Sequence, residues 1–581
     1  MHLVLLETSG NQSFIFSTNK LRENVGASEL TYRAGTQWLL EAVEQAGGPP
    51  GLWDENTWQL RRNLLNPQLN RAITDEGVIA EVILATSGKA LLLVKTRECG
   101  QEIICKVTTK AIQYAPGLDL CGVISNHFEW EEERIGDVNR MLHERFDEVH
   151  ANLPGPAMRF LRLPVVEDCA TSGLPAAQLD RSDKNDAGPR SAVSRHKRAY
   201  RQKYATRMQA LLDPDEAKIR FARNIEKLEE GSEWLAVIHA DGNGLGEVFL
   251  NFGEYADCTH ARQNRDYVNR YRRFSLGLDI CTEKAFLKAL TEMLRRDKDA
   301  WFEPRILPIV LGGDDLTVVC DGQAALQFTY DFLTEFEEQT GRNDLELVGD
   351  IIPYIAGEAF PSTRHLSACA GVAIVKPHFP FSASYDLAEE LIRSAKEVKR
   401  LIVHPDKQKH GQPVPWPCSA IDFHALYDST ATSLSEIRRK LRPDDGKTRI
   451  YGRPYVVTKP EKLKGAAEES QRWTEDHHWQ KLRARVEKIQ EQEDGRRKIP
   501  NSQLHDLRAG LHLGKSFADA RFNLIRQRYQ TESDKGIEVL AENNGTFFRP
   551  ETIDEDGEEK KVWVTSLLDA MDAANFWGRE E

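Results

Sequence analysis

The chain has 581 residues, with 77 Lys and Arg against 90 Asp and Glu, a net charge of −13. At roughly 150 residues per domain this length predicts three or four domains, and the acidic balance argues against a polyanion-binding protein driven by net positive charge. No apolar run approaches the roughly 18 residues that span a bilayer, and the 9 cysteines include no CxxC pair. We therefore expect a soluble, cytoplasmic chain with reduced thiols and no membrane contact.

The N-terminal part, residues 1–165, predicts an α+β domain. Apolar runs at 3–6, 78–85 and 90–94 are typical of strands, and the spacing over 36–46 is typical of a helix. Residues 166–230 are expected to form a linker and a helical segment, because 169–192 is rich in Gly, Pro, Ser and Asp. The basic run 195–207 opens a helix predicted to continue past Leu211, and a solvated helix face is favoured for it over a phosphate-binding patch.

The central part, residues 231–425, has the most regular pattern. It predicts, in order, a strand at 234–239, a helix at 276–296, strands at 305–311 and 316–320, a helix at 324–338, a strand at 366–375 and a helix at 387–400. This βαββαβ order is the split βαβ, ferredoxin-like arrangement, with expected strand order 4-1-3-2. Residues 426–581 contain mainly charged helical segments and predict a helical C-terminal domain.

Two segments of the central part carry Asp and Gly together: HADGNGLG at 239–246 and LGGDD at 311–315. The first strand is expected to end near Asp241, and the second and third strands to be joined by a hairpin at 312–315. Because the first and third strands are antiparallel neighbours, Asp241 should lie beside Asp314 and Asp315. Carboxylates this close repel unless a cation neutralises them, and an all-oxygen site suits Mg²⁺ or Mn²⁺.

The glycines around these carboxylates suit a nucleotide. Gly312 and Gly313 can adopt positive φ in the turn, while Gly242, Gly244 and Gly246 let backbone amides approach a triphosphate. Such a site supports phosphoryl or nucleotidyl transfer, in which metals activate a ribose hydroxyl and stabilise the leaving pyrophosphate. Either segment alone is more often an ordinary strand ending in a turn, but their joint occurrence in a βαββαβ frame favours the site.

With these segments in view, the central part resembles the cyclase/polymerase palm of the large subunit of type III CRISPR effector complexes. Residues 367–400 resemble that family's SAG strand, Pro-containing turn and closing AK helix, with Lys396 in the position of the AK lysine, and AIDFHAL at 420–426 adds a short match. GNQSFIFSTNKLRENVGASEL at 10–30 resembles the family's first, degenerate palm, which lacks the Asp motif. DCATSGLPA at 168–176 resembles its inter-palm segment.

The resemblance implies an α+β fold with two ferredoxin-like palm domains in tandem and a helical C-terminal domain. The expected catalytic residues are Asp241, Asp314 and Asp315, and the expected ligands of Mg²⁺ or Mn²⁺ are these three carboxylates with the Gly242 carbonyl. The expected nucleotide-binding residues are Gly242, Asn243, Gly244, Gly246, Gly312, Gly313, Lys396 and Ser28. Asn243 stands where the family has a second carboxylate. Ser28, predicted between two helical stretches, is read equally as a phosphate ligand at a helix N-terminus or as an ordinary N-cap.

Two functions remain open at this point. The first is a metal-dependent nucleotidyltransferase that joins ATP or another NTP into a cyclic nucleotide messenger in antiviral defence, with RNA, CRISPR-type subunits or a second copy of the chain as further partners. The rival is a non-catalytic palm scaffold that binds nucleotide or RNA. A template-dependent polymerase is weaker, because no fingers or thumb segment is evident. The first palm begins at residue 1, so no HD nuclease is expected, and the single Cys169 argues against a zinc cluster between the palms.

Overall fold

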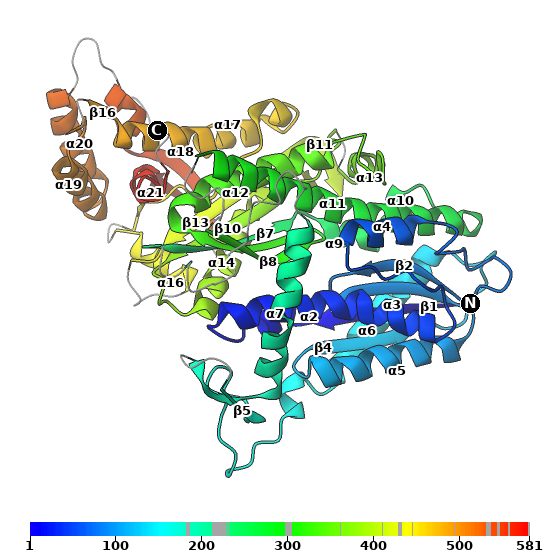
Figure 1. The fold of residues 1–581 in the computed structure, drawn as a ribbon. Coiled ribbons are helices and arrows are strands. Elements are labelled where there is room, and N and C mark those ends of the chain that lie inside the picture. Colours follow the sequence, from blue (N-terminus) through cyan, green and yellow to red (C-terminus); the bar gives the residue numbers. More distant parts are fainter. Residues whose placement is uncertain are drawn as a thin grey trace.

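The computed structural model describes residues 1–581 except 182–185, 212–227, 229–231, 297–304, 361, 410, 428–432, 444–445, 494–495, 530–535, 543–545, 556–557 and 579–581. Its two palms lie side by side, with the C-terminal part against the second palm (Figure 1). One continuous core of buried apolar side chains reaches from the first palm through the second to the C-terminal part. None of the helices described has the length and hydropathy needed to cross a bilayer.

The first palm has the predicted ferredoxin-like topology. Its antiparallel sheet has the order β2-β3-β1-β4, formed by β1 (His2–Ser9), β2 (Ala80–Thr86), β3 (Lys89–Val94) and β4 (Asp119–Ile124). The helices are α1 (Asn11–Ile15), α2 (Leu21–Gly35), α3 (Gln37–Gln45), α4 (Thr57–Leu65), α5 (Arg97–Tyr114) and α6 (Ile135–Ala151). The sheet is buried on both faces, which explains the almost unbroken apolar runs of β1 and β3.

The inter-palm segment leads through η1 (Pro156–Arg159), β5 (Gln178–Asp180) and β6 (Gly188–Arg190) into α7 (Ala192–Ala210), which crosses α2. The prediction of a solvated basic face on this helix is wrong in part. Lys197 and Arg207 are buried against α2, and Arg207 donates to Glu29 at 2.8 Å. Arg198 likewise pairs with Glu23 at 2.8 Å. Buried α2 carboxylates thus neutralise part of the basic run. The predicted continuation of the helix past Leu211 falls outside the residues described.

The second palm confirms the predicted strand order. Strands β7 (Leu235–Gly242), β8 (Ile306–Gly312), β9 (Asp315–Asp321) and β10 (Ala368–Val375) lie in the order β10-β7-β9-β8, which is 4-1-3-2. Its helices are α9 (Leu245–Leu250), α10 (Phe252–Tyr255), η4 (Ala261–Gln263), α11 (Asn264–Arg296), α12 (Gly322–Thr340), α13 (Ile351–Ala359), α14 (Phe381–Ala395) and α15 (Val398–Leu401). A separate hairpin, β11 (Val403–Lys409) and β12 (Gln412–Pro415), follows.

Two strands extend this sheet beyond a four-stranded palm. β13 (Ala420–Ala425) pairs in parallel with β10, and β15 (Tyr455–Val456) pairs with β13. The helix α14 packs on β10, β7 and β13. It comes this close because Gly371 has no side chain: a Cβ there would lie 2.2 Å from the Ala388 carbonyl oxygen. The close approach of α14 brings its C-terminal turn to the end of β7.

The C-terminal part is helical, as predicted, but it also holds a small sheet. The helices are α16 (Leu434–Lys440), η6 (Pro460–Leu463), α17 (Glu468–Asp476), α18 (Trp479–Gln490), α19 (Asn501–His512), α20 (Lys515–Tyr529), η7 (Gly536–Leu540) and α21 (Leu567–Ala573). The sheet has the order β14-β19-β18, formed by β14 (Thr448–Arg449), β18 (Arg549–Glu555) and β19 (Glu558–Val564), and β16 (Gln492–Glu493) pairs with β17 (Arg496–Arg497).

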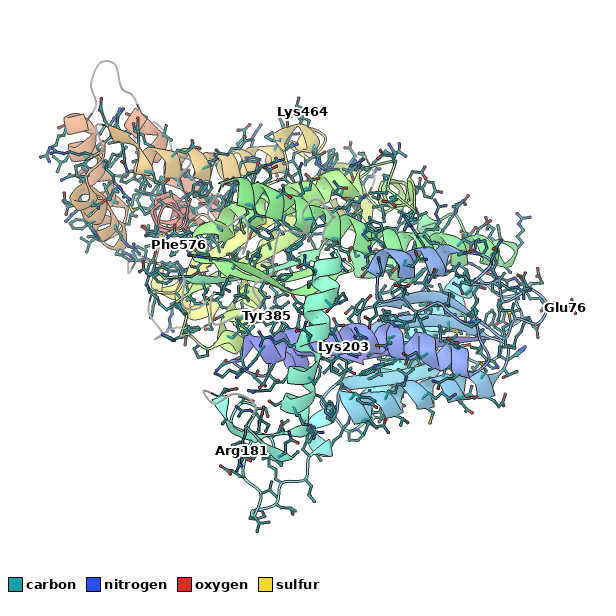
Figure 2. All side chains as sticks on the ribbon, in the orientation of Figure 1. Glu76, Arg181, Lys203, Tyr385, Lys464 and Phe576 are labelled. Carbon is teal, nitrogen blue, oxygen red and sulfur yellow. The ribbon has the colours of Figure 1, made fainter. Side chains whose placement is uncertain are left out.

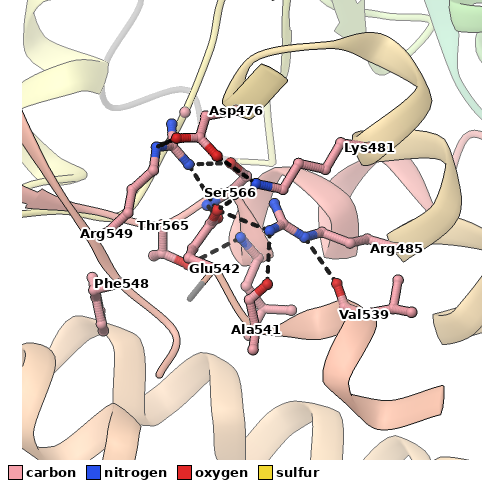
Figure 3. Close-up of polar contacts among 12 residues, drawn as sticks. Asp476, Lys481, Arg485, Val539, Ala541, Glu542, Phe548, Arg549, Thr565 and Ser566 are labelled. Atoms are coloured by element: carbon pink, nitrogen blue, oxygen red, sulfur yellow. Dashed lines mark hydrogen bonds and ion pairs between the residues drawn. The ribbon is translucent and has the colours of Figure 1, made fainter. Parts of the chain in front are cut away.

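A buried ion-pair cluster holds this C-terminal part together (Figure 3). Glu542 accepts from Arg549 at 2.8 Å and pairs with Arg485 at 2.9 Å, and its other oxygen accepts from the Ser566 amide at 2.7 Å. Burial alone would raise the pKa of Glu542, but Arg485 and Arg549 outweigh it and lower the pKa. The carboxylate is therefore ionised and its lone pairs are occupied, as a buried pair requires.

Candidate active site

The end of β7 and the β8–β9 hairpin bring the predicted carboxylates together. The register pairs Ala240 with Leu316 across β7 and β9, and Gly312 with Asp315 across β8 and β9. The two-residue tip is Gly313 and Asp314, with Gly313 at φ 61°, a left-handed conformation that favours glycine. Asp314 is hydrogen-bonded to Asp241. Residues far apart in sequence thus meet at one end of the sheet.

The pKa values of Asp314 and Asp315 are raised, in part because the carboxylates lie close together. Burial raises the pKa of Asp314 well above its usual value, and the charge and hydrogen bond of Asp241 raise it further. The Asp315 side chain is 38% exposed, yet its Oδ1 atom is turned inward, and burial of the group, together with Asp241 and Glu389, raises its pKa as well. The raised pKa of Asp314 is the usual consequence of placing one buried carboxyl against another.

Lys396 is the one cation in contact with this group among the residues described. Its Nζ donates to Asp241 Oδ2 from the C-terminal end of α14. Lys399 lies on the following turn, half-buried, and its pKa is lowered by burial and by Lys396. The predicted lysine thus reaches the carboxylates, but it pairs with Asp241 rather than standing free for a phosphate.

Three side chains that sequence reasoning missed surround the site: His239, Glu389 and Tyr385. Buried His239 on β7 lies 3.4 Å from Asp315 Oδ1 and 3.7 Å from Glu389 Oε1, and its pKa is lowered by burial despite both Glu389 and Asp241. The Tyr385 and His239 rings lie 5.4 Å apart. The helix period could have found two of them, because Tyr385, Glu389 and Lys396 recur at spacings of four and seven residues on one face of α14.

The first palm contacts this same helix. Gln12 on α1 donates to Glu389 at 2.6 Å, the Phe16 and Tyr385 rings stack at 3.9 Å, and the Asn19 side chain accepts from the Phe381 amide. A cavity of about 350 Å³ lies between α1 and α14, lined in part by Gln12, Phe16, Tyr385 and Glu389. Figure 2 shows Tyr385 near the middle of the molecule, at the junction of the palms. The resemblance of residues 10–30 to a packing partner of the second palm agrees with these contacts.

The predicted glycines divide into two groups. Gly242 is needed for close approach, because a Cβ there would lie 2.8 Å from Asp314 Oδ2. Gly244 has φ 75° at the N-cap of α9, and Gly246 faces open space. Gly313, by contrast, is already bound: its amide donates to Asp279 and its carbonyl accepts from Thr282 at 2.5 Å. The hairpin tip is therefore anchored to α11 instead of presenting its amide to a ligand.

Two predicted nucleotide-binding residues lie elsewhere. Asn243 is buried, and its side-chain amide donates to Ser367 Oγ and the Cys418 carbonyl, both at 3.0 Å. It joins β7 to β10 and to the start of β13. The predicted helix N-terminus at Ser28 is wrong, since Gly26 and Ser28 lie inside the continuous helix α2 and are buried. The helices α2 and α7 cross closely at Gly26, and Cys169 is hydrogen-bonded to Thr171.

The donor set fits a hard divalent cation, because Asp241, Asp314 and Asp315 offer only oxygen ligands, and a cation would favour the ionised forms of Asp314 and Asp315, whose pKa values are raised without it. No three His, Cys, Asp or Glu side chains in the described part of the chain already surround one point as metal ligands. At this site the Lys396 ammonium group donates to one oxygen of Asp241. A cation bound through that oxygen would have to replace the ion pair.

The raised carboxylate pKa predicts how stability depends on pH. Between the unfolded Asp value of about 3.9 and the higher folded pKa of Asp314, the Asp314 carboxyl binds more proton in the metal-free native chain than in the unfolded one, so its contribution to stability should fall as pH rises. Divalent cation should offset this loss more strongly at about pH 8.5 than at about pH 5.5. Asp314→Asn should melt higher than the parent at the upper pH in EDTA and lose the cation effect. Melting curves at both pH values, with and without the cation, test this prediction. Asp386→Asn, at an exposed position, is the control. A cation-dependent shift in Asp314→Asn equal to that of the parent would refute the prediction.

Comparison with known proteins gives one sequence match. Residues 234–401 match the family model described as Cas10/Cmr2, second palm domain, which spans β7 to α15 and includes all three carboxylates. No curated protein matches the sequence significantly. The resemblance inferred from the residues is thereby confirmed for the second palm.

Similar solved structures include a chain of the type III-B Cmr-β complex in its apo state, with 12% identity, 93% of this chain and 78% of that chain covered, and a TM-score of 0.48. A Csm1–Csm4 cassette in complex with AMPPNP has 13% identity and a TM-score of 0.40, with 93% of this chain and 64% of that chain covered. Csm1 from T. onnurineus has 15% sequence identity and a TM-score of 0.36, with 71% of this chain and 55% of that chain covered. This chain spans less than two thirds of the length of the last two.

Proposed function

We propose that this chain, whose residues 234–401 match the Cas10/Cmr2 second palm domain, is a metal-dependent nucleotidyltransferase. It joins ATP, or another NTP, into a cyclic nucleotide messenger in type III CRISPR defence, as part of a complex with partner subunits. The observation that supports this best is the contact of Asp314 with Asp241 at the hairpin, with Asp315 beside them. Three acidic side chains brought together from distant parts of the chain have little structural use without a cation.

The chain's own residues bind and orient in this reaction. Asp241, Asp314 and Asp315, with the Gly242 carbonyl, would hold Mg²⁺ or Mn²⁺, which when bound polarises the phosphate and the attacking hydroxyl. Lys396, released from Asp241, would pair with the triphosphate. A ribose hydroxyl of one nucleotide bonds to the α-phosphorus of the next, the α–β phosphoanhydride bond breaks, pyrophosphate leaves and the hydroxyl proton passes to water. No dedicated base is required.

The first palm supplies the wall for the second nucleotide in this proposal. Its α1 borders the cavity beside Glu389, where the Phe16 and Tyr385 rings offer a stacking surface for a base. The first palm has no Asp pair at the end of β1, where the sequence reads ETSGN at residues 7–11. In this proposal the second palm supplies the carboxylate site, and the first palm helps to bind the second nucleotide without carboxylates of its own.

The second candidate is a palm scaffold that binds nucleotide without chemistry. The Lys396–Asp241 ion pair favours it, because a permanent lysine can neutralise a carboxylate in place of a metal. Asn243, turned into the core, adds no ligand.

One experiment separates the two candidates. The purified chain is incubated with Mg²⁺ or Mn²⁺ and each NTP, alone and mixed, and with target RNA and partner subunits, and products are identified by mass spectrometry. A cyclic or linear oligonucleotide with pyrophosphate, absent in Asp314→Ala/Asp315→Ala, is the expected result. ATP-dependent thermal stabilisation that is equal in both proteins, without product, would establish the scaffold instead.

A further inference from the structure

The helix α11 (Asn264–Arg296) joins the two palms through one charged stripe. Arg265, Arg272 and Asp279 recur every seven residues, and Glu283 follows four residues later. Because seven residues make about two helical turns, these side chains lie on one face. The stripe carries two positive charges in its first half and two negative charges in its second.

The positive half is fixed to the first palm. Arg265 donates to Glu81 of β2 at 2.7 and 3.0 Å, and Arg272 donates to the same carboxylate at 2.7 Å. Arg272 also donates to the Val82 carbonyl at 3.0 and 2.8 Å. Glu81 is only 1% exposed, so these are desolvated, charge-assisted bonds, which are stronger and more sharply oriented than surface pairs. These bonds therefore fix the position of the first turns of α11 relative to the first palm.

The negative half is fixed to the carboxylate hairpin. Asp279 accepts the Gly313 amide, and Thr282 donates to the Gly313 carbonyl at 2.5 Å. Both polar groups of the residue that precedes Asp314 are therefore bonded to α11. A shift of α11 moves the hairpin tip with it, because a buried backbone group cannot lose its partner without cost.

Arg61, on α4 of the first palm, closes the link. Its guanidinium donates both bonds of a fork to Glu283 at 2.7 Å each and lies 3.8 Å from Asp279 Oδ2. Arg61 is 2% exposed and Glu283 is 6% exposed. Burial raises the pKa of Asp279, and Arg61 opposes this rise. Without Arg61, the buried carboxylates of Asp279 and Glu283 would lose their ion-pair partner, which is costly for such groups.

We propose that Arg61 and Glu283 are positioning residues for the candidate active site: through Asp279 and Thr282 they let the first palm set the place of the Gly313–Asp314 tip. The degenerate palm thus has a second task, to hold the hairpin that carries the carboxylates. The effect on rate rests on the proposed function, whereas the effect on the hairpin does not.

The test measures hydrogen exchange over residues 306–321 in the full chain, together with steady-state kinetics. Arg61→Met should speed exchange at the hairpin at least about tenfold, as expected for the loss of about 1.4 kcal/mol of local stability. Thr282→Val, nearly isosteric, should do so by removing one bond to Gly313. The control is Arg62→Ala, the next residue, whose pair with Glu346 is exposed, and it should leave exchange unchanged.

The kinetic readout separates positioning from simple loss of fold. Arg61→Met should lower kcat about tenfold or more with KM changed less than about threefold, since substrate contacts are intact and only the placement of the metal ligands is lost. Arg61→Lys, which retains the charge but not the fork, should recover part of kcat.

The exchange and kinetic data have distinct meanings. Hairpin exchange that is equal in Arg61→Met, Thr282→Val and Arg62→Ala would overturn the proposal, whatever the activity. If Arg61→Met does not fold, hydrogen exchange at the hairpin in Arg61→Lys and Thr282→Val tests the proposal instead. Faster hairpin exchange in a chain that yields no product even as wild type would support the positioning link while counting against the proposed function.

Discussion

Asp241→Asn is expected to reduce nucleotide joining by at least about a thousandfold, because metal ligation supplies several kcal/mol of charge stabilisation and 1.36 kcal/mol corresponds to a factor of ten. The substitution preserves the shape of the side chain and removes one of the three carboxylates. It also leaves Lys396 without its ion-pair partner, although the amide oxygen still accepts a hydrogen bond. The loss should therefore appear in catalysis and in the cation-dependent thermal shift, not in the fold.

Product yield by mass spectrometry and melting curves with and without Mn²⁺ are the measurements for this prediction. Asp344→Asn is the matched control, since Asp344 is exposed, lies in a loop and pairs with Arg342 two residues away. Activity within about tenfold of wild type in Asp241→Asn would mean that this carboxylate does not ligate the metal, and the site would have to be reassigned to the hairpin alone.

Gly26→Ala is expected to cause the largest loss of stability. A Cβ at Gly26 would lie 1.7 Å from the Lys197 carbonyl oxygen and 2.6 Å from its carbon. These are backbone atoms of α7, so α2 and α7 must separate at this crossing, where the Lys197 ammonium group also donates to Phe14 and Ser17. Overpacking of this kind costs about 3 kcal/mol or more, which in a domain of this size lowers the melting temperature by roughly 6–12 °C.

The control for this prediction is Gly246→Ala, because a Cβ at Gly246 meets no atom within 4 Å. That residue lies in a helix, where alanine is favoured, so its melting temperature should stay equal or rise. A Gly26→Ala protein that melts with the parent would show that α2 and α7 do not cross this closely in solution.

The fold was predictable from the sequence because the two palms follow local patterns. Strand runs such as 90–94 and helix periods such as 324–338 depend on neighbouring residues only, and their βαββαβ order then fixes the strand order. The meeting of Asp241 with Asp314 followed from that order. What local patterns missed depends on long-range packing: Ser28 was expected between two helical stretches, yet it lies inside the continuous helix α2, which packs closely against α7 at Gly26.

The surroundings of the site were predictable only in part, for a similar reason. Lys396 was found by resemblance, but its partner Asp241 lies 155 positions away, and nothing near Lys396 indicates that the two pair. Arg61 and Glu283 are 222 positions apart, and each alone reads as an ordinary charged helix residue. Buried ion pairs of this type become visible only once tertiary contacts are known.

The strands that extend the second palm bear on how this protein can be dissected in the laboratory. The family match stops at residue 401, whereas the sheet continues through β13 and β15 to Val456. A fragment that ends at the limit of the match would expose the fully buried, apolar strand β10 as a bare edge. Bare apolar edges recruit other chains. Recombinant expression of the matched segment alone would therefore yield aggregates, and the smallest soluble unit of the second palm must include residues that its family description leaves out.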